Sequence, residues 1–558
     1  MNAAILGPLG LVLLIVAYKF YGHFIAEKIF NLGREQGPTP AQEFRDDIDF
    51  VPTRKEILVG HHFSSIAGAA PIVGPAVAAI WGWLPAFIWI VFGVIFMGAC
   101  HDFGALVVSM KHKGGSMAQV AESVLGARAR ILFMIVMFFL VWMVIAVFAL
   151  VIANLFISFP ASVIPINFEI IVALLMGFLI NKQNRHLKIP SIAAQIILIV
   201  MIIVGTKYPI SLAPIFGQNE LMAWEIFLLV YSFIASVLPV WMLLQPRDYI
   251  NSHQLFIGLV LMVVGVVVAH PRIVAPALNL SPQGAPPWFP FLFITIACGA
   301  ISGFHGLVSG GTTSKQVAHW KDAKPIGYGS MLAEGLLALL ATLAVTSGFG
   351  SGEAWHSHYA NWNQANGLSA KISAFVLGAG KFVAALGIPE EIGHTVIAVL
   401  IISFAATSLD TACRIQRYII EEFGSNMCIR PLQNRYVGSF IAVLSAFLLM
   451  LTSNGGKGGL YLWPLFGATN QMLAAMTMMI VSVYLWKQGK KLKQKKNILP
   501  FLLPAIFLIG ITSLGLILNI HFFYRSQNWA LTIIAIIIFT LQILIVAESL
   551  MLFRKKVV

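Results

Sequence analysis

Charged side chains are scarce in this chain: Asp, Glu, Lys and Arg make up 10% of its 558 residues, whereas hydrophobic residues make up 59%. A soluble domain carries about 25% charged residues, so this composition excludes an ordinary soluble protein. The apolar residues come in runs of about 17 to 25, the length that crosses a bilayer as a helix. We therefore predict an all-α polytopic membrane protein surrounded by the lipid bilayer.

Cysteine pairs and catalytic motifs are also missing. The four cysteines lie in or beside apolar stretches and show no CxxC or paired spacing, which argues against a disulfide framework or a zinc site. The chain contains no HExxH or GxSxG motif and no paired cytoplasmic acids with a phosphate-binding loop, which argues against a membrane-embedded protease or lipid transferase. We therefore predict no metal, no cofactor and no enzymatic activity.

Fifteen apolar segments are predicted to span the membrane. They are centred on residues 4–25, 61–81, 84–110, 131–157, 168–181, 189–206, 223–243, 254–275, 288–312, 330–348, 394–413, 435–452, 459–486, 499–519 and 528–553. Segment 372–386 is apolar but short and carries Gly378 and Gly380, so we expect a re-entrant or interfacial helix there and leave it uncounted.

Positive charge predicts how these spans are oriented. The chain carries 36 Lys and Arg against 22 Asp and Glu, and membrane proteins hold such an excess in their cytoplasmic loops. With the N-terminus outside, the inside segments contain 29 of the 36 basic residues. This split predicts an outside N-terminus and a cytoplasmic C-terminus, and it accounts for the net charge without a nucleic-acid partner.

The segment 61–75 cannot run as a regular helix. Pro71 and Pro75 each remove a backbone donor, and Gly68 and Gly74 loosen the turn between them. Broken helices at membrane depth are tolerated where the freed N–H and C=O groups face protein or a watery cavity, and transporters bind substrates and ions with such groups. A proline kink that only packs is the alternative. The candidate substrate-binding residues here are Ser64, Ser65, Gly68 and Gly74.

A second break is predicted in segment 298–316, which holds five glycines and six hydroxyl or amide side chains. Its backbone amides would face an anionic or zwitterionic substrate; close helix packing and capping is the alternative. Asn470, at the head of a later apolar helix, would either line the pathway or hydrogen-bond between helices. The candidates are Ser302, Gly303, His305, Ser309, Gly310, Gly311, Thr312 and Asn470.

Ionisable groups at membrane depth are costly and therefore candidates for ion coupling. Asp410 would carry the driving proton, or nearby hydroxyl oxygens would hold sodium; alternatively, Asp410 would simply pair with Arg414 four residues on. Histidines could relay protons because they titrate near neutral pH. Arg247 would cap the inner face or gate it through Asp248 or Asp102. The ion-coupling candidates are Asp410, Thr407, Ser408, Glu334, Asp102, His61 and His62.

Six long motifs carry a family resemblance. They are HHFSSIAGAAPIVGP (61–75), HDFGALVVSMKHKGGSM (101–117), QPRDYINSHQL (245–255), CGAISGFHGLVSGGTTSKQ (298–316), FAATSLDTACRIQRYIIEE (404–422) and WPLFGATNQMLAA (463–475). In these the chain resembles the carbon starvation protein A family of bacterial inner-membrane transporters. The resemblance covers residue 5 to about 490, so we assign 1–490 to the transporter domain and 491–558 to a C-terminal two-helix extension preceded by a basic cytoplasmic loop.

The resemblance implies uptake of peptides or pyruvate during carbon starvation. It also implies a distant relation to the amino acid-polyamine-organocation superfamily, with discontinuous helices and an inverted-repeat transporter core. Together with the buried acids, it leads us to expect a proton symporter for a small carboxylate or short peptide. A sodium-coupled symporter and a membrane-embedded nutrient sensor without flux, working with an unidentified sensor kinase, are the alternatives.

Overall fold

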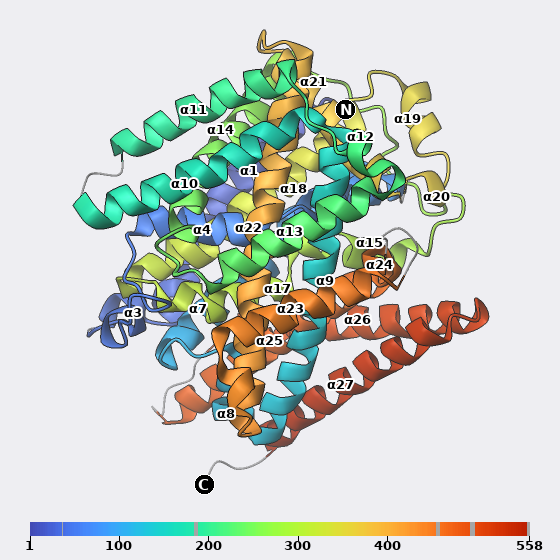
Figure 1. Ribbon diagram of the computed structural model, residues 1–558. Coiled ribbons are helices and arrows are strands. Elements are labelled where there is room, and N and C mark those ends of the chain that lie inside the picture. Colours follow the sequence, from blue (N-terminus) through green and yellow to red (C-terminus); the bar gives the residue numbers. More distant parts are fainter. Residues whose placement is uncertain (36, 184–187, 366, 453–457, 492–496, 555–558) are drawn as a thin grey trace.

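The computed structural model describes residues 1–35, 37–183, 188–365, 367–452, 458–491 and 497–554. These residues form a helical bundle, and their β-structure is limited to two isolated bridges, Asn2 with Arg272 and Thr53 with Val317. Figure 1 places the N-terminus at one end of the bundle and the end of α27 at the other. Seven basic residues that entered the charge count lie outside the described residues: Arg185, Lys457, Lys493, Lys495, Lys496, Lys555 and Lys556.

The helices that are long and apolar enough to cross a membrane number twelve among the described residues, or thirteen with one bent pair. The twelve runs are Ala3–Ile29, Trp83–Lys111, Ala127–Ser158, Pro160–Leu179, Pro190–Lys207, Ala213–Val237, Leu244–Ala269, Trp320–Ser347, Glu390–Asn426, Trp463–Lys490, Leu499–Arg525 and Trp529–Met551. They contain, in order, α1 (Ala3–Lys19), α6 (Trp83–Gly93) with α7 (Ala99–Lys111), α9 (Ala127–Ser158), α10 (Val163–Gln183), α11 (Lys188–Lys207), α13 (Glu220–Val237), α14 (Leu244–Ala269), α18 (Ser330–Ser347), α22 (Glu390–Asn426), α25 (Trp463–Lys491), α26 (Leu499–Arg525) and α27 (Trp529–Arg554).

The predicted count of fifteen spans is therefore corrected. Segment 288–312 is divided into the short helices α15 (Trp288–Thr295), α16 (Ala297–Ala300) and α17 (Gly303–Gly311). Segment 435–452 forms α23 (Arg435–Met450), whose 16 residues fall short of the about 20 that a crossing helix needs. The glycines and hydroxyl residues of the first segment break the helix, and the second is shorter than its apolar run.

The first predicted break is confirmed. α4 (Lys55–Ala67) and α5 (Ala70–Ala78) meet at an angle of 43°. Gly68 joins them with φ of +49°, a conformation that L side chains rarely adopt. A Cβ at this position would lie 2.9 Å from the Ser408 hydroxyl. Pro71 stands in the first turn of α5, where its missing N–H leaves no helical bond unmade.

The second predicted break is confirmed as well, and the two breaks pack against each other. Ile301 and Ser302 are extended between α16 and α17. A Cβ on Gly299 would lie 3.4 Å from Pro71 Cα, and one on Gly74 would lie 2.4 Å from the carbonyl oxygen of Thr295. Glycine at these positions allows α5 to approach α15 and α16 closely, so the two discontinuous helices share one centre.

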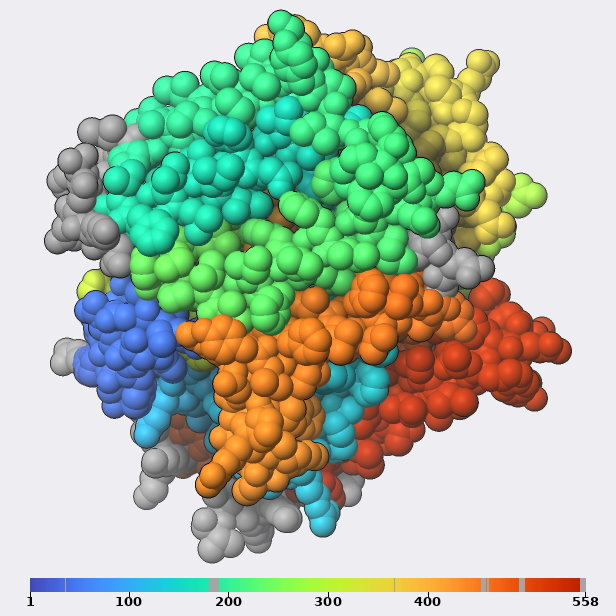
Figure 2. Space-filling model, viewed as in Figure 1, coloured from blue at the N-terminus to red at the C-terminus, as the bar shows by residue number. Residues whose placement is uncertain are grey.

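The uncounted segment 372–386 belongs to α21 (Leu368–Ala384), a continuous helix of 17 residues outside the set of candidate spans. The helix continues through Gly378. A Cβ at this position would lie 2.3 Å from the carbonyl oxygen of Ala344 in α18. The glycine thus serves close packing of two helices. Figure 2 shows one face of the molecule, which α10, α11 and α13 (teal to green) and α23 (orange) cover.

Candidate functional site

A buried arginine holds together three helices. The Arg247 guanidinium of α14 forms an ion pair with Asp410 of α22 and donates to the Tyr231 hydroxyl of α13 at 2.5 Å. Its Nη2 also lies 3.1 Å from Asp248 Oδ1. Arg247 is 1% exposed, and Asp248 and Asp410 are 0% exposed. One buried guanidinium is therefore shared by two buried carboxylates.

The same group of side chains reaches the first broken helix. His61 of α4 places Nδ1 2.5 Å from Asp248 Oδ2, and the Thr407 hydroxyl donates to Asp248 Oδ1 at 3.1 Å. Arg247, Asp248, Asp410, Tyr231 and His61 are called the Arg247 cluster below. A change in its charge would act on α4, α13, α14 and α22 together.

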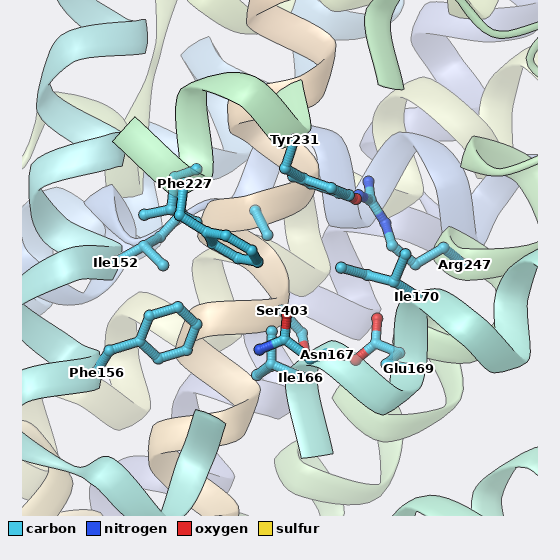
Figure 3. Close-up of a pocket in the computed structure, with 12 residues that line it drawn as sticks. Ile152, Phe156, Ile166, Asn167, Glu169, Ile170, Phe227, Tyr231, Arg247 and Ser403 are labelled. Atoms are coloured by element: carbon cyan, nitrogen blue, oxygen red, sulfur yellow. Dashed lines mark hydrogen bonds between the residues drawn. The ribbon is translucent and has the colours of Figure 1, made fainter. Parts of the chain in front are cut away.

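Two buried acids escaped the prediction. Glu169 of α10 accepts a hydrogen bond of 2.9 Å from the Ser403 hydroxyl of α22, and it lines a cavity of about 20 Å³ with Arg247 and Tyr231 (Figure 3). Glu225 of α13 is fully buried, and its carboxylate oxygens have no hydrogen-bond partner among the described residues. Both stand inside predicted apolar spans, which was the signal that would have found them.

A second cluster gathers other predicted ion-coupling residues. Asp102 of α7 lies 2.8 Å from Nδ1 of its neighbour His101 and 3.1 Å from Nδ1 of His305 in α17. Nε2 of His305 lies 3.4 Å from Glu334 of α18. We call these four residues the Asp102 cluster. The predicted ion-coupling acids are thus divided between two sites, with Asp410 in one and Asp102 and Glu334 in the other.

The predicted hydroxyl stripe of α22 has two sets of partners. Thr407 contacts Asp248, whereas the Ser408 hydroxyl donates to the Ser65 carbonyl of α4 at 2.9 Å. The Ser65 hydroxyl lies 3.2 Å from that of Thr411. Ser408 and Thr411 therefore bind the last turn of α4 directly before its break at Gly68.

His62 and the residues of the second break are held mainly by helix contacts. His62 Nδ1 lies 2.9 Å from the Thr313 hydroxyl, just beyond α17. Asn470 Oδ1 accepts from the Phe304 N–H at 2.9 Å and from the Ser302 hydroxyl at 3.2 Å, so it caps α17 from α25.

Four further candidates lie in and directly after α17. A Cβ on Gly303 would lie 2.3 Å from the Asn470 carbonyl oxygen, one on Gly310 would lie 3.1 Å from Met117 Cγ, and one on Gly311 would lie 3.5 Å from Ile415 Cγ1. The Thr312 hydroxyl donates to the Val308 carbonyl.

Two predicted partners are wrong. Asp410 pairs with Arg247, not with Arg414, whose Nη1 lies 3.2 Å from Asp49 Oδ1. Arg247 is buried and so is not a surface cap; of its two predicted partners it contacts Asp248, whereas Asp102 lies against His101 and His305. The spacing of four residues within α22 suggested the first pairing, but the helix turns the two side chains toward different neighbours.

Residues 44–54 cross the predicted cytoplasmic end of the bundle as a strap. Asp49 accepts from the Tyr418 hydroxyl at 2.5 Å and from Arg414, and the Thr53 N–H donates to the Gln316 carbonyl at 2.9 Å. Burial opposes ionisation of Asp49, but the surrounding cations, Arg414 first, outweigh it and hold the pKa of this carboxyl below its usual value. The strap thus joins α22 to the segment that follows α17.

Compensated charges buried beside two broken helices, inside an all-helical membrane bundle, are characteristic of secondary transporters. In its fold, the chain is similar to the crystal structure of MhsT in complex with L-phenylalanine, with a TM-score of 0.50 and 11% identity over 83% of this chain and 98% of that one. This likeness concerns the fold alone.

The chain belongs to the family described as Carbon starvation protein CstA, whose model matches residues 2–349 and 353–515. It is 33% identical to the peptide transporter CstA of Campylobacter jejuni, over 90% of this chain and 78% of that protein. It is 32% identical to the peptide transporter CstA of Bacillus subtilis, over 91% and 89%. It is 30% identical to the pyruvate/proton symporter BtsT of Escherichia coli, over 92% and 82%. The resemblance of the motifs is thereby confirmed, and the molecule is a membrane transporter and not an enzyme.

Proposed function

We propose that the protein is a proton symporter that takes up peptides or pyruvate across the bacterial inner membrane during carbon starvation. The observation that carries the coupling step is the buried ion pair between Arg247 and Asp410. A proton on Asp410 would cancel its charge and weaken the pair, which would loosen α22 from α14. Relatives named as peptide transporters and as a pyruvate/proton symporter support both substrates and the driving ion.

Both substrates present a carboxylate, and the packed helix breaks offer polar groups to receive it. The hydroxyl groups of Ser64 in α4 and Ser309 in α17 are buried without a hydrogen-bond partner among the described residues. Buried polar groups are rarely left unpaired unless a ligand or water reaches them. Together with the backbone at Gly68 and Ser302, these hydroxyls are our proposed substrate contacts.

The Asp102 cluster would supply a second place for protons, because two histidines and two carboxylates share it at 2.8 to 3.4 Å. His61 and His62 are adjacent on α4; the first belongs to the Arg247 cluster, and the second forms a hydrogen bond with the segment after α17. Movement of α4 would therefore act on both sides of the transporter core. With the N-terminus outside, the strap would part from Arg414 when the inner side opens.

The test is uptake into proteoliposomes under an imposed inward proton gradient, with labelled pyruvate and a labelled dipeptide measured in parallel. We expect gradient-dependent accumulation of at least one of them, abolished by a protonophore and unaffected by sodium. Accumulation that requires sodium would contradict proton coupling and show that sodium is the driving ion. Substrate binding without accumulation of either compound would contradict transport and favour a sensor.

The Asp410→Asn variant tests the residue. It keeps the size of the side chain but removes the acid, so we expect an intact fold, retained substrate exchange and no proton-driven accumulation. Glu548→Gln is the matched control, because Glu548 is an acid of α27 outside the Arg247 cluster. Uphill uptake that survives unchanged in Asp410→Asn would show that Asp410 is structural.

A further inference from the structure

Glu169 differs from the other two acids around Arg247. Asp248 and Asp410 both contact the guanidinium directly, whereas Glu169 forms no ion pair with any described residue. The Ser403 hydroxyl donates a hydrogen bond to its carboxylate at 2.9 Å. Glu169 is 2% exposed, so bulk water does not replace the missing cation.

Charge compensation assigns a proton to Glu169. The charged and titratable groups beside Glu169 are Tyr231 and Arg247, which line the same cavity, and Asp248, whose charge acts on it. His61 and Asp410 lie one contact further away, on Asp248 and Arg247 respectively. Arg247 forms ion pairs with Asp248 and Asp410, and His61 Nδ1 lies 2.5 Å from Asp248 Oδ2. A third ionised carboxylate would add a negative charge with no ion-pair partner to this buried site, which is strongly unfavourable. The neutral acid must be the one that lacks a cation, and that is Glu169.

The cavity provides a route from Glu169 to Asp410. Glu169, Tyr231 and Arg247 line it together, and in the view of Figure 3 Glu169 lies below Arg247 and Tyr231. Its volume of about 20 Å³ admits one water molecule. The Tyr231 hydroxyl donates to Asp410 Oδ2 at 2.9 Å, so it connects the cavity to the second acid. The remaining walls include Phe156, Ile166 and Phe227 and exclude bulk water.

We propose that Glu169 is a second proton-binding residue and that Arg247 exchanges Asp410 for Glu169 when the coupling proton moves between them. The O–H bond on Glu169 breaks, the proton passes through the cavity and the Tyr231 hydroxyl, and an O–H bond forms on Asp410. Glu169 becomes the carboxylate and takes the guanidinium, so the total charge of the cluster is unchanged. The exchange releases α22 from α14 and rests on the proton symport proposed above.

Glu169→Gln tests the proposal because it imitates a permanently protonated side chain. We expect it to keep substrate exchange across the membrane and to lose proton-driven accumulation. Glu169→Asp keeps an acid and should restore part of the accumulation, which a purely structural role of the side chain would not require. Glu548→Gln is the matched control: it makes the same substitution at an acid of α27 outside the Arg247 cluster, so accumulation should persist.

Infrared spectroscopy of the purified protein gives a readout that does not depend on transport. At neutral pH, Glu169→Gln should lose one protonated-carboxyl band that wild type and Asp410→Asn both retain. If the band is unchanged in Glu169→Gln, Glu169 is ionised and the proposal is overturned, whatever the transport result. If wild type accumulates substrate with protons and Glu169→Gln does so equally, the proposal fails while proton symport stands. If wild type shows no proton-driven accumulation, the symport itself fails.

Discussion

Removal of the Arg247 side-chain charge is the perturbation whose cost the geometry defines best. In the wild type, Asp248 and Asp410 share the Arg247 guanidinium; in Arg247→Met these two carboxylates would remain buried without it. Breaking a buried ion pair by removing one partner costs about 3–5 kcal/mol, because the remaining charge stays unpaired. Asp410→Asn should cost less, about 1–3 kcal/mol, since Arg247 keeps Asp248 and Tyr231.

The double variant separates the ion pair from the other contacts of both side chains. Once Arg247 is methionine, changing Asp410 to Asn removes a repelling charge. The second substitution should then be neutral or stabilising, and the two single costs should exceed the double cost by about 1–3 kcal/mol. Isosteric apolar replacement of a whole buried pair is often tolerated for the same reason.

The assay is the free energy of unfolding in detergent for wild type, both single variants and the double variant at one pH, followed by uptake into proteoliposomes. We expect a coupling energy of the stated size and no proton-driven accumulation in any variant. Strictly additive costs would refute the reasoning, because they would mean that Arg247 and Asp410 do not compensate each other's charge in the folded protein.

Two further predictions concern the helix break and the strap. Gly68→Ala forces an L residue into φ +49° and brings its Cβ to 2.9 Å from the Ser408 hydroxyl, so it should lower the free energy of unfolding by about 1–3 kcal/mol and slow uptake. Gly510→Ala, whose Cβ meets nothing within 4 Å, should change neither the stability nor the uptake rate. Equal behaviour of the two variants would contradict the role of the break. Because the pKa of Asp49 is lowered in the folded state, its stabilisation is present above the unfolded value of about 3.9 and is lost as pH falls through the folded value. Asp49→Asn should therefore unfold more easily than wild type at neutral pH, and the gap in thermal midpoint should close in acid; a gap that does not depend on pH would refute this.

Local sequence patterns predicted the breaks and the family well. Gly68 and Pro71 act on the backbone within one or two residues, so their effect is visible without knowing what packs against them. The glycines of segment 298–316 act in the same way. The predicted number of crossing helices was too high for two reasons. Segment 288–312 was counted as one span although its glycines divide it into short helices, and segment 435–452 was counted although α23 has only 16 residues.

The composition of the site was harder to predict, since it depends on which helix faces meet. Arg247 and Asp410 are 163 positions apart, and spacing within α22 pointed instead to Arg414. Glu169 stands near the start of an apolar run and was passed over, although an acid in such a run is costly to bury and is therefore a candidate functional residue. His61 and His62 were predicted together, but their side chains bind Asp248 and Thr313, respectively.

The most direct test of the account is the proton flux that substrate itself produces. Substrate would be added to proteoliposomes with no initial pH gradient, and the internal pH followed with a trapped indicator. The account predicts that entry of pyruvate or of a dipeptide acidifies the interior in wild type and that Asp410→Asn abolishes this acidification. Substrate entry without a change in internal pH, or equal acidification by Asp410→Asn, would contradict coupling through the Arg247–Asp410 pair.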